Sequence, residues 1–296
     1  MKNLTVFTPS YNRAYCLDKL YKSLCNQKSK DFLWLIVDDG SIDNTRELVK
    51  QWISENIVEI HYIYKENGGM HTAHNLAYRN ITTEINVCID SDDYMEDNAV
   101  EDIISSWSKV KNNKKIAGMV GLNRDPKGNL IGGKLPTNIE FGKFHLLYHK
   151  YGVFGDKKIV LRTNILKNYM LYPEYPEERL VPLSYLYYSL DKEYDFLYVN
   201  SIWAVVDYQV DGSSANIIKQ YFSSPKGFNF SKYYEYKNTK VFKYKIKALI
   251  HFGFTSIILG DYLFFKKSPN KILSIILLPI SIFLYFSNKK KLESLK

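Results

Sequence analysis

Apolar and polar positions follow two alternating periods over the first 120 residues of the chain. Apolar runs rich in β-branched and aromatic residues occur at 4–8, 33–38, 57–64, 85–90 and 116–120, and helical patterns lie between them at 14–26, 44–54, 71–79 and 98–111. Strands that alternate with helices are typical of βαβ units. The run at 34–37 is apolar throughout, as expected for a strand buried on both faces of a sheet. The pattern therefore predicts an α/β fold with a mostly parallel sheet flanked by helices.

Polar residues gather where three of these strands end. One cluster at 8–13 follows the first strand, a second at 38–41 follows the second, and a third at 90–93 follows the fourth. In open α/β sheets, ligands bind at the carboxyl ends of the strands. Three polar clusters on one sheet edge therefore predict a ligand site there.

The third cluster holds three carboxylates within four residues, those of Asp90, Asp92 and Asp93. Carboxylates this close repel one another, and hard oxygen ligands of this kind suit Mg²⁺ or Mn²⁺. A metal held by one or two carboxylates takes its other ligands from phosphate oxygens and neutralises a leaving diphosphate. The alternative is structural, because aspartates also cap helices and complement the helix dipole.

The second cluster and a glycine turn at 67–69 also have a functional and a structural interpretation. One carboxylate of the pair Asp38 and Asp39 could accept the N–H of a nucleotide base. Alternatively, the cluster could be a strand-to-turn connection in which Asp43 or Ser41 caps the next helix. The glycine turn precedes a helix whose N-terminus could face phosphates. His71 and His74 lie one turn apart on that helix, but no third ligand near them in the sequence argues for zinc.

Four motifs follow one another in order within about residues 4–100: Thr8-Pro9-Ser10-Tyr11-Asn12-Arg13, Val37-Asp38-Asp39-Gly40-Ser41, Asn67-Gly68-Gly69 with Ala73-His74-Asn75, and Ile89-Asp90-Ser91-Asp92-Asp93. Together they resemble the motif set of family-2 glycosyltransferases with a GT-A (Rossmann-like) fold. The resemblance implies a nucleotide-sugar donor, usually UDP-linked, and inverting transfer without a covalent intermediate. It implies that Asp39 with Thr8 and Tyr11 holds the uridine, while Asp92 and Asp93 hold ribose, metal and diphosphate. The donor-binding residues implied in this way are Thr8, Pro9, Tyr11, Arg13, Asp38, Asp39, Asn67, Gly69, His74, Asn75, Asp90 and Asp92.

Later parts of the chain resemble a narrower subgroup from bacterial capsule and cell-surface polysaccharide clusters. The matching stretches are Gly155-Asp156-Lys157, residues 172–182 and residues 208–214. In that subgroup a Glu stands at the place of Glu178, which we therefore expect to be the catalytic base, with Glu177 and Asp156 as alternatives. Direct displacement at the anomeric carbon needs a carboxylate within hydrogen-bond reach of the acceptor hydroxyl. The structural alternative for Glu177 and Glu178 is a solvated loop or a first helical turn.

The basic residues are concentrated at the end of the chain. The net charge is +9, and residues 231–296 contain thirteen lysines against three acidic residues. Two apolar stretches in this region, 248–265 and 272–286, are bordered by lysines at every boundary. A basic, apolar tail favours an anionic membrane surface, whereas nucleic-acid binding would call for basic residues spread over the body. We therefore expect residues 241–296 to attach the protein to a membrane surface, with no nucleic-acid partner.

These observations predict two domains and a location. We expect a GT-A catalytic domain at 1–230, with a nucleotide-sugar-binding half at 1–115 and an acceptor half at 116–230, followed by a helical membrane-associating tail at 231–296. The apolar stretch near the N-terminus, 4–7, is too short for a signal peptide. Three cysteines without CxxC spacing fit a reducing compartment. The expected location is the cytoplasm, in monotopic contact with the cytoplasmic face of the cell membrane.

The function expected from the sequence is metal-dependent, inverting transfer of a hexose or N-acetylhexosamine to a glycan hydroxyl, on an acceptor that is lipid-linked. Mn²⁺ or Mg²⁺ would be the cofactor, and surface polysaccharide synthesis the process. Two alternatives remain open: a nucleotidyltransferase, and a non-catalytic sugar-nucleotide-binding scaffold. The chain lacks the early Gly-rich, basic phosphate loop that a nucleotidyltransferase usually shows, and Asp92 and Asp93 argue against a scaffold.

Overall fold

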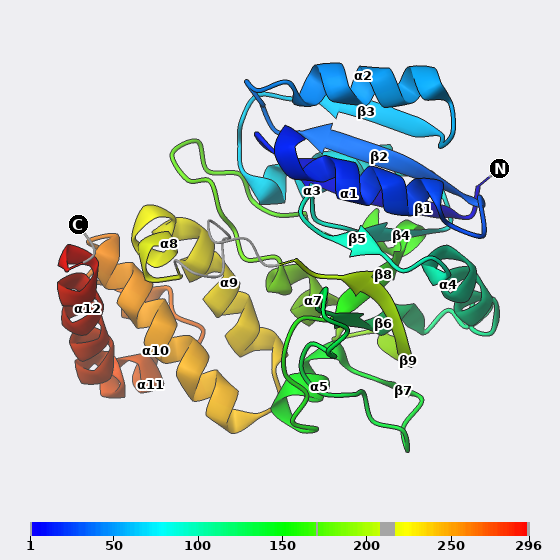
Figure 1. Ribbon diagram of the computed structural model, residues 1–296. Helices are drawn as coiled ribbons and strands as arrows, with labels where there is room; N and C mark the ends of the chain where they lie inside the picture. Colours follow the sequence, from blue (N-terminus) through cyan, green and yellow to red (C-terminus); the bar gives the residue numbers. More distant parts are fainter. Residues whose placement is uncertain (1, 170, 208–216, 295–296) are drawn as a thin grey trace. The chain divides into compact units, whose positions relative to one another are not determined.

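A computed structural model describes residues 2–169, 171–207 and 217–294, which form two compact units (Figure 1). The first, called here the sheet unit, comprises the chain up to Leu171 and the segment that contains the last strand. The second, called the helical unit, comprises Tyr172–Lys192 and the C-terminal helices. The boundary expected at residue 230 falls inside helix α9 (Pro225–Asn238), and the Tyr172–Lys192 segment clusters with those helices.

The sheet unit follows the βαβ order expected from the sequence. Its elements are β1 (Leu4–Ser10), α1 (Ala14–Cys25), β2 (Phe32–Asp38), α2 (Thr45–Glu55), β3 (Ile60–Tyr64), α3 (Met70–Asn80), β4 (Ile85–Cys88), β5 (Tyr94–Met95), α4 (Ala99–Ser108), β6 (Ile116–Arg124), β7 (Phe141–Gly142), α5 (Phe144–His149), β8 (Lys158–Arg162), α6 (Thr163–Leu166) and β9 (Asp195–Val205). The strands form one sheet in the order β3-β2-β1-β4-β8-β6-β9-β5, with β7 paired to β9. The strands and helices predicted over the first 120 residues are confirmed within a few residues at their ends.

Strands β1, β2, β3 and β4 are parallel, and β1 lies between β2 and β4. It pairs with β2 on one side and β4 on the other, both in parallel register. The chain therefore reverses its direction of travel across the sheet at β1, after α3. A reversal of this kind opens a crevice beyond the carboxyl ends of the two strands, where ligands bind.

The sheet is mixed, which corrects the expectation of a mostly parallel one. Strand β8 runs antiparallel to both of its neighbours, β4 and β6, and the short strands β5 and β7 run antiparallel to β9. The long segment between β6 and β8 holds only β7 and the short helix α5, so the chain returns to the sheet without the long crossover helix that joins parallel neighbours. The antiparallel β8 completes the sheet beside β4.

Successive side chains of a strand point to opposite faces of the sheet, and each face is covered by different helices. Leu4 and Val6 of β1 join the same buried cluster as residues of α1, α2 and α4. On the opposite face, the ring of Phe7 packs edge-on against His74 and Tyr78 of α3, at centroid distances of 5.0 and 5.5 Å. The parallel strands are therefore covered on both faces, as their apolar sequences require.

The helical unit contains the expected C-terminal helices together with one earlier helix. Its elements are α7 (Ser184–Leu190), α8 (Ile217–Ser223), α9, α10 (Phe242–Ile258), η2 (Phe264–Lys266), α11 (Lys271–Ile276) and α12 (Leu278–Glu293). The apolar stretch at 248–265 is divided. Leu249, Phe252 and Phe254 are buried within this unit, whereas Leu259, Tyr262 and Leu263 are exposed. Among the described residues, none of the helices has the length and apolar character to cross a membrane.

Candidate active site

The predicted ligand edge lies where β1, β2 and β4 end. The amide of Asp39 donates to the carbonyl of Ser10 at 2.8 Å, so the loops after β1 and β2 leave the sheet side by side. The acidic segment 90–93 begins just after β4, the other neighbour of β1. The topology therefore brings the three polar clusters to one edge, as expected.

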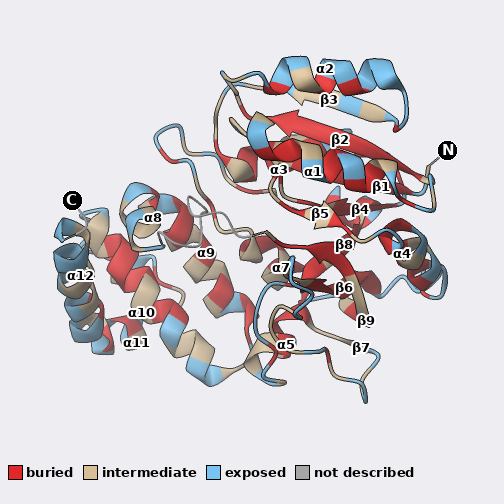
Figure 2. Cartoon of the chain, viewed as in Figure 1, coloured by how far each residue is buried: buried red, intermediate tan, exposed pale blue. Residues whose placement is uncertain are grey.

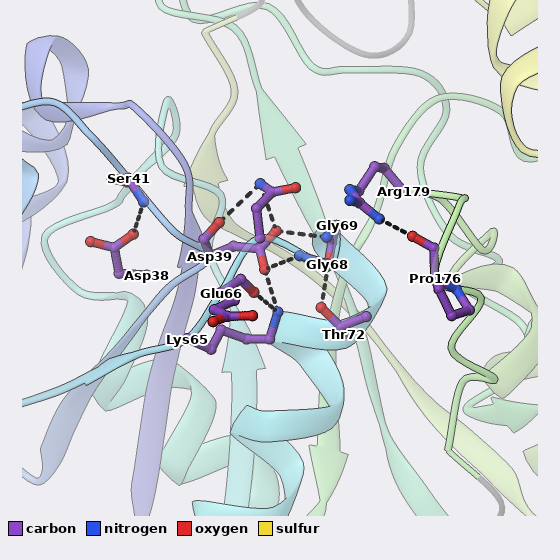
Figure 3. Close-up of polar contacts among 11 residues, drawn as sticks. Asp38, Asp39, Ser41, Lys65, Glu66, Gly68, Gly69, Thr72, Pro176 and Arg179 are labelled. Atoms are coloured by element: carbon purple, nitrogen blue, oxygen red, sulfur yellow. Dashed lines mark hydrogen bonds and ion pairs between the residues drawn. The ribbon is translucent and has the colours of Figure 1, made fainter.

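Asp39 organises the glycine turn before α3 (Figure 3). Its Oδ1 accepts from the Lys65 ammonium at 2.6 Å and from the amide of Gly68 at 2.9 Å, and its Oδ2 accepts from the amide of Gly69 at 2.7 Å. The turn depends on glycine at Gly69, whose φ is +94°, a conformation that other residues rarely adopt. Asp39 is 4% exposed, so this carboxylate is held tightly by the turn that it organises.

Asp38 and Asn12 fix the loops on either side of Asp39. Asp38 accepts from the amide of Ser41 at 2.8 Å and from the Tyr62 hydroxyl, and it is buried. Asn12 has a φ of +52°, and its side chain accepts from the amide of Ile42 at 2.8 Å. These contacts hold the two loops in place. The Asp38 carboxylate is used by Ser41 and Tyr62 and is not exposed to a ligand.

The residues after β1 divide between the core and the surface. Thr8 is fully buried, and its hydroxyl accepts from the indole N–H of Trp34 at 2.9 Å, since Thr8 lies on the same strand face as Leu4 and Val6. Tyr11 is 47% exposed at the loop, and Pro9 and Arg13 are half-buried. Tyr11 therefore offers the open aromatic face expected there, whereas the Thr8 side chain has a structural partner.

His74 and Asn75 lie on α3 and are buried. The Nδ1 atom of His74 lies 3.2 Å from the Tyr78 hydroxyl, and its ring packs between Phe7 and Tyr78. Burial lowers the pKa of His74 to about 4, so the imidazole is neutral near pH 7. A neutral, packed imidazole cannot supply the positive charge expected of a diphosphate contact.

The acidic cluster after β4 has a basic partner that the sequence analysis missed. The ammonium of Lys158, at the start of β8, lies 3.4 Å from Oδ2 of Asp93, and both side chains are almost fully buried. Burial raises the pKa of Asp93 to about 7 against the opposing effect of Lys158. Burial also opposes the charge of Lys158, but Asp93 and Asp90 raise its pKa overall. Lys158 therefore balances one of the three carboxylates.

The donor set fits a divalent cation that shares its ligands with a substrate. Burial, followed by repulsion from Asp90, raises the pKa of the half-buried Asp92. Within the described ranges, no group of three or more His, Cys, Asp or Glu side chains forms a complete cation cage. One or two carboxylates with open positions for phosphate oxygens are the usual way in which proteins hold Mg²⁺. Asp92 and Asp93 would hold such an ion.

Glu178, the expected base, lies in the helical unit at the N-terminus of α9. Its two carboxylate oxygens accept from the amides of Lys226 and Gly227, both at 2.8 Å, and the side chain is 4% exposed. The local turn is closed by a bond from the Glu178 amide to the Tyr175 carbonyl at 3.0 Å. A carboxylate that satisfies two free amides of a first helical turn stabilises that helix. Glu178 thus has a structural role whatever its chemical one.

The alternative bases are more exposed. The Glu177 carboxylate lies 3.0 Å from the Lys226 ammonium with 71% of its side chain exposed, and Asp156 is exposed in the sheet unit before β8. Arg179 donates to the Pro176 carbonyl at 2.7 Å in the same turn as Glu177 (Figure 3). The motif at 208–214, cited above for its resemblance to the capsule subgroup, lies outside the described residues.

Lys65 and Lys158 are the two site residues that sequence reasoning missed. Each is a lysine next to a buried carboxylate of the predicted site, Asp39 in one case and Asp93 in the other. No local pattern marks Lys65. No local pattern marks Lys158 either, because its burial depends on the place of β8 beside β4.

We expect Asp39→Asn to weaken binding of UDP about tenfold or more, because the substitution weakens the acceptor for Lys65, Gly68 and Gly69 together. Lys65→Met is the matched control, since it removes one of those donors and leaves the carboxylate free for a base N–H. Calorimetric titration with UDP measures both. Equal losses in the two variants would contradict a direct role of Asp39 toward the base.

We expect acid to destabilise the sheet unit through His74. The pKa of this group is about 4 in the folded chain and 6.5 without burial. The unfolded chain therefore takes up the proton first as the pH falls, and stability present above pH 6.5 is lost toward pH 4. Between neutral pH and about pH 5, the free energy of unfolding should fall by about 2 kcal/mol more in the wild type than in His74→Phe. Hydrogen exchange of β1 and β4 amides at matched pH measures this, and equal losses would contradict it.

The fold and this edge together define a class of protein. A mixed α/β sheet with a topological reversal at β1 carries a glycine turn, an exposed aromatic and a carboxylate cluster at one edge, which suits a nucleotide diphosphate with a cation. The family model described as "Glycosyl transferase family 2" matches residues 5–169, more than half of the chain. The chain belongs to this family and is a glycosyltransferase with a GT-A-like fold.

Relatives and solved structures agree with this assignment. The chain is 26% identical over 243 residues to the poly(ribitol-phosphate) beta-N-acetylglucosaminyltransferase TarP of Staphylococcus aureus (strain N315), covering 76% of this chain and 70% of TarP. Other curated relatives are much longer, and the chain spans as little as 13% of their length. Of the solved structures, S. aureus TarS 1-349 in complex with UDP-GlcNAc has a TM-score of 0.62 at 17% identity, covering 97% of this chain and 81% of that one. The mannosyltransferase PcManGT from Pyrobaculum calidifontis, in complex with GDP-Man and Mn²⁺, has a TM-score of 0.57 at 15% identity, covering 97% and 82%.

Proposed function

We propose that this glycosyltransferase moves an N-acetylhexosamine or a hexose from a UDP-linked donor to a hydroxyl of a glycan, with inversion at the anomeric carbon. The observation that carries the proposal is the buried acidic cluster after β4, which faces the same sheet edge as the Asp39 turn. The name of TarP and the ligand of the TarS structure support UDP-GlcNAc as the first donor to test.

In this proposal the loops after β1 and β2 bind the uridine. The face of Tyr11 stacks on the base, and Asp39 accepts the base N–H. A carboxylate has about four acceptor sites, and Asp39 already accepts from four donors. These are the Lys65 ammonium, the amides of Gly68 and Gly69, and the side-chain amide of Asn67 at 3.4 Å. Lys65 is the flexible one of these donors and would give way to the base.

Asp92 and Asp93 would hold Mn²⁺ or Mg²⁺ together with the diphosphate. Such a cation would neutralise the negative charge of the leaving diphosphate. Lys158 keeps Asp93 in place from within the unit, and the charge of Arg13 lowers the pKa of Asp92 against the effect of burial. The Mn²⁺ in the PcManGT structure supports the choice of ion.

Glu178 remains the proposed base. The two amides of α9 fix the orientation of its carboxylate, and a general base must be positioned within hydrogen-bond reach of the acceptor proton. Glu177 and Asp156 are the alternatives, and both are more exposed.

We further propose that the acceptor is lipid-linked and that the enzyme works at the cytoplasmic face of the cell membrane, in capsule or other surface polysaccharide synthesis. The basic and apolar C-terminal region supports the membrane location. The names of TarP and TarS, both poly(ribitol-phosphate) beta-N-acetylglucosaminyltransferases, support a polymeric acceptor.

Release of UDP tests the proposed reaction. The protein is incubated with UDP-GlcNAc, UDP-GalNAc, UDP-Glc or UDP-Gal in the presence of Mn²⁺, with and without a glycan acceptor. We expect acceptor-dependent UDP release with one of these donors and its loss on chelation of the metal. Pyrophosphate release would instead indicate a nucleotidyltransferase, and tight donor binding without any UDP release would indicate a binding scaffold.

A further inference from the structure

Helices α11 and α12 bury their small polar residues and expose their large apolar ones. The buried residues of these helices are Ser274 and Ser281. Among the large apolar side chains, Ile272 is 74% exposed, Ile276 65% and Phe283 72%. In Figure 2, α12 is correspondingly pale blue and tan over most of its length. A surface helix of a protein in water shows the opposite arrangement, with its apolar stripe buried.

The contact between α12 and α10 is made by small residues. The Ser281 hydroxyl donates to the Ile250 carbonyl at 3.0 Å. A Cβ atom on Gly253 would lie 2.6 Å from the Ser281 Oγ, so the two helices approach closely at this point. Small residues at the helix contact, with a hydroxyl bonded across it, are typical of helices that pack against each other in lipid.

The exposed apolar residues recur at helical spacing. Positions 272 and 276 lie one turn apart on α11, and positions 280, 283 and 286 recur every three residues on α12, so in each helix they share one side. The two sets together are called here the stripe. Patches of this kind on a protein surface mark a contact with a partner or a membrane.

The charges beside the stripe favour a membrane over a protein partner. Lys266, Lys267 and Lys271 precede the stripe and Lys289, Lys290 and Lys291 follow it, and all six are exposed. The only acidic residues between 259 and 294 are Asp261, paired with Lys267 at 2.8 Å, and Glu293. An apolar stripe flanked by lysines at both ends matches the boundary between acyl chains and anionic headgroups.

We propose that the α11–α12 stripe inserts into the surface of an anionic membrane, with the six lysines at the level of the headgroups. The opposite side of α12 packs on α10, so the helix lies along the surface with only its outer side in lipid. The proposal rests on the proposed function only in that it names the surface where the lipid-linked acceptor would be met. It narrows the attachment site from residues 241–296 to α11 and α12.

Vesicle sedimentation with the full chain tests the proposal. We expect the wild type to sediment with vesicles of phosphatidylcholine and phosphatidylglycerol, and more weakly with phosphatidylcholine alone. The triple variant Ile276→Ser, Phe283→Ser, Phe286→Ser removes three exposed side chains and should lower the partition coefficient at least about tenfold. Lys289→Gln, Lys290→Gln, Lys291→Gln should reduce the preference for the anionic vesicles.

A matched control removes apolar surface elsewhere. Ile53→Ser with Ile57→Ser changes exposed isoleucines at and beyond the end of α2 in the sheet unit and should leave sedimentation unchanged. Circular dichroism verifies that each variant is folded. If the wild type does not sediment, or if the triple variant sediments like the wild type, the proposal is wrong.

Two further readouts separate this proposal from its rivals. Light scattering that shows a wild-type oligomer, dissolved by the triple variant and without vesicle binding, would assign the stripe to contact between copies of this chain and overturn the proposal. The thermal shift caused by UDP with Mn²⁺ should persist in every variant. Vesicle binding without any UDP effect or release in the wild type would refute the proposed function while leaving the membrane surface intact.

Discussion

The Asp93→Asn variant is expected to lose sugar transfer and also to unfold more easily, because it leaves the Lys158 ammonium buried without its carboxylate. The exposed fractions of the Lys158 and Asp93 side chains are 9% and 5%. Breaking a buried ion pair by removing one partner costs about 3–5 kcal/mol. In the proposed function the Asp93 charge holds the cation and the diphosphate, so its loss should reduce transfer about 10²-fold or more. Urea unfolding and UDP release measure the two effects separately.

Three companion variants separate the structural effect from the chemical one. Asp93→Asn with Lys158→Met should recover most of the stability, because no charge is left unpaired, and should remain inactive. Asp92→Asn should lose transfer with the fold unchanged, since Asp92 is only half-buried. Lys157→Met is the control for removal of a buried lysine, as the Lys157 ammonium donates to the carbonyls of Ile131 and Phe154 and not to the cluster. Unchanged affinity for UDP with Mn²⁺ in both aspartate variants would contradict the metal assignment.

The Glu178→Gln variant is expected to lower kcat about 10²-fold or more while the affinity for the donor hardly changes. A general base acts on the acceptor in the transition state and contributes about 10²–10⁴-fold. The same substitution leaves one acceptor oxygen for the two amides of α9, so the helical unit should lose about 1 kcal/mol of stability. Initial rates at saturating acceptor, calorimetric titration with UDP and thermal unfolding measure these three quantities.

Glu177→Gln is the matched control for Glu178. It changes the neighbouring carboxylate, which is exposed and pairs with Lys226, and should leave kcat near the wild-type value. If Glu177→Gln abolished turnover and Glu178→Gln lowered only the stability, the base would be Glu177 and Glu178 would serve α9 alone. If neither changed kcat, Asp156 would be the remaining candidate.

Local periodicity was enough for the parallel half of the sheet, and it failed where strands are short and antiparallel. The runs that became β1, β2 and β4 are apolar and each is followed by a polar cluster, so their ends could be placed in advance. Strand β8 offers five residues with a charged residue at each end, Lys158 and Arg162. Its place between β4 and β6 depends on pairing with strands far away in the sequence, which no local pattern expresses.

The residues of the site likewise differ in how far local sequence predicts them. Asp39 and Asp93 were found because motifs at strand ends mark them, but their lysine partners were not. The contact between Lys158 and Asp93 joins residues 65 positions apart, and only the insertion of β8 beside β4 creates it. The burial of the Thr8 side chain is different, because the period of two along β1 already places Thr8 on the face of Leu4 and Val6.

The sequence by itself determined the fold class, the sheet edge where the three polar clusters meet and the family, since these depend on periodicity and on motifs that lie within single strand–loop–helix units. Only the tertiary structure decided which charges are paired and which apolar stretch is exposed. The stretches at 248–265 and 272–286 look alike in composition. The first buries Leu249, Phe252 and Phe254 in the helical unit and exposes large apolar side chains only near its end, whereas the second presents most of its large side chains outward. The reason is that burial and charge pairing depend on which surfaces meet after the chain has folded, and those surfaces come from segments that are remote in the sequence.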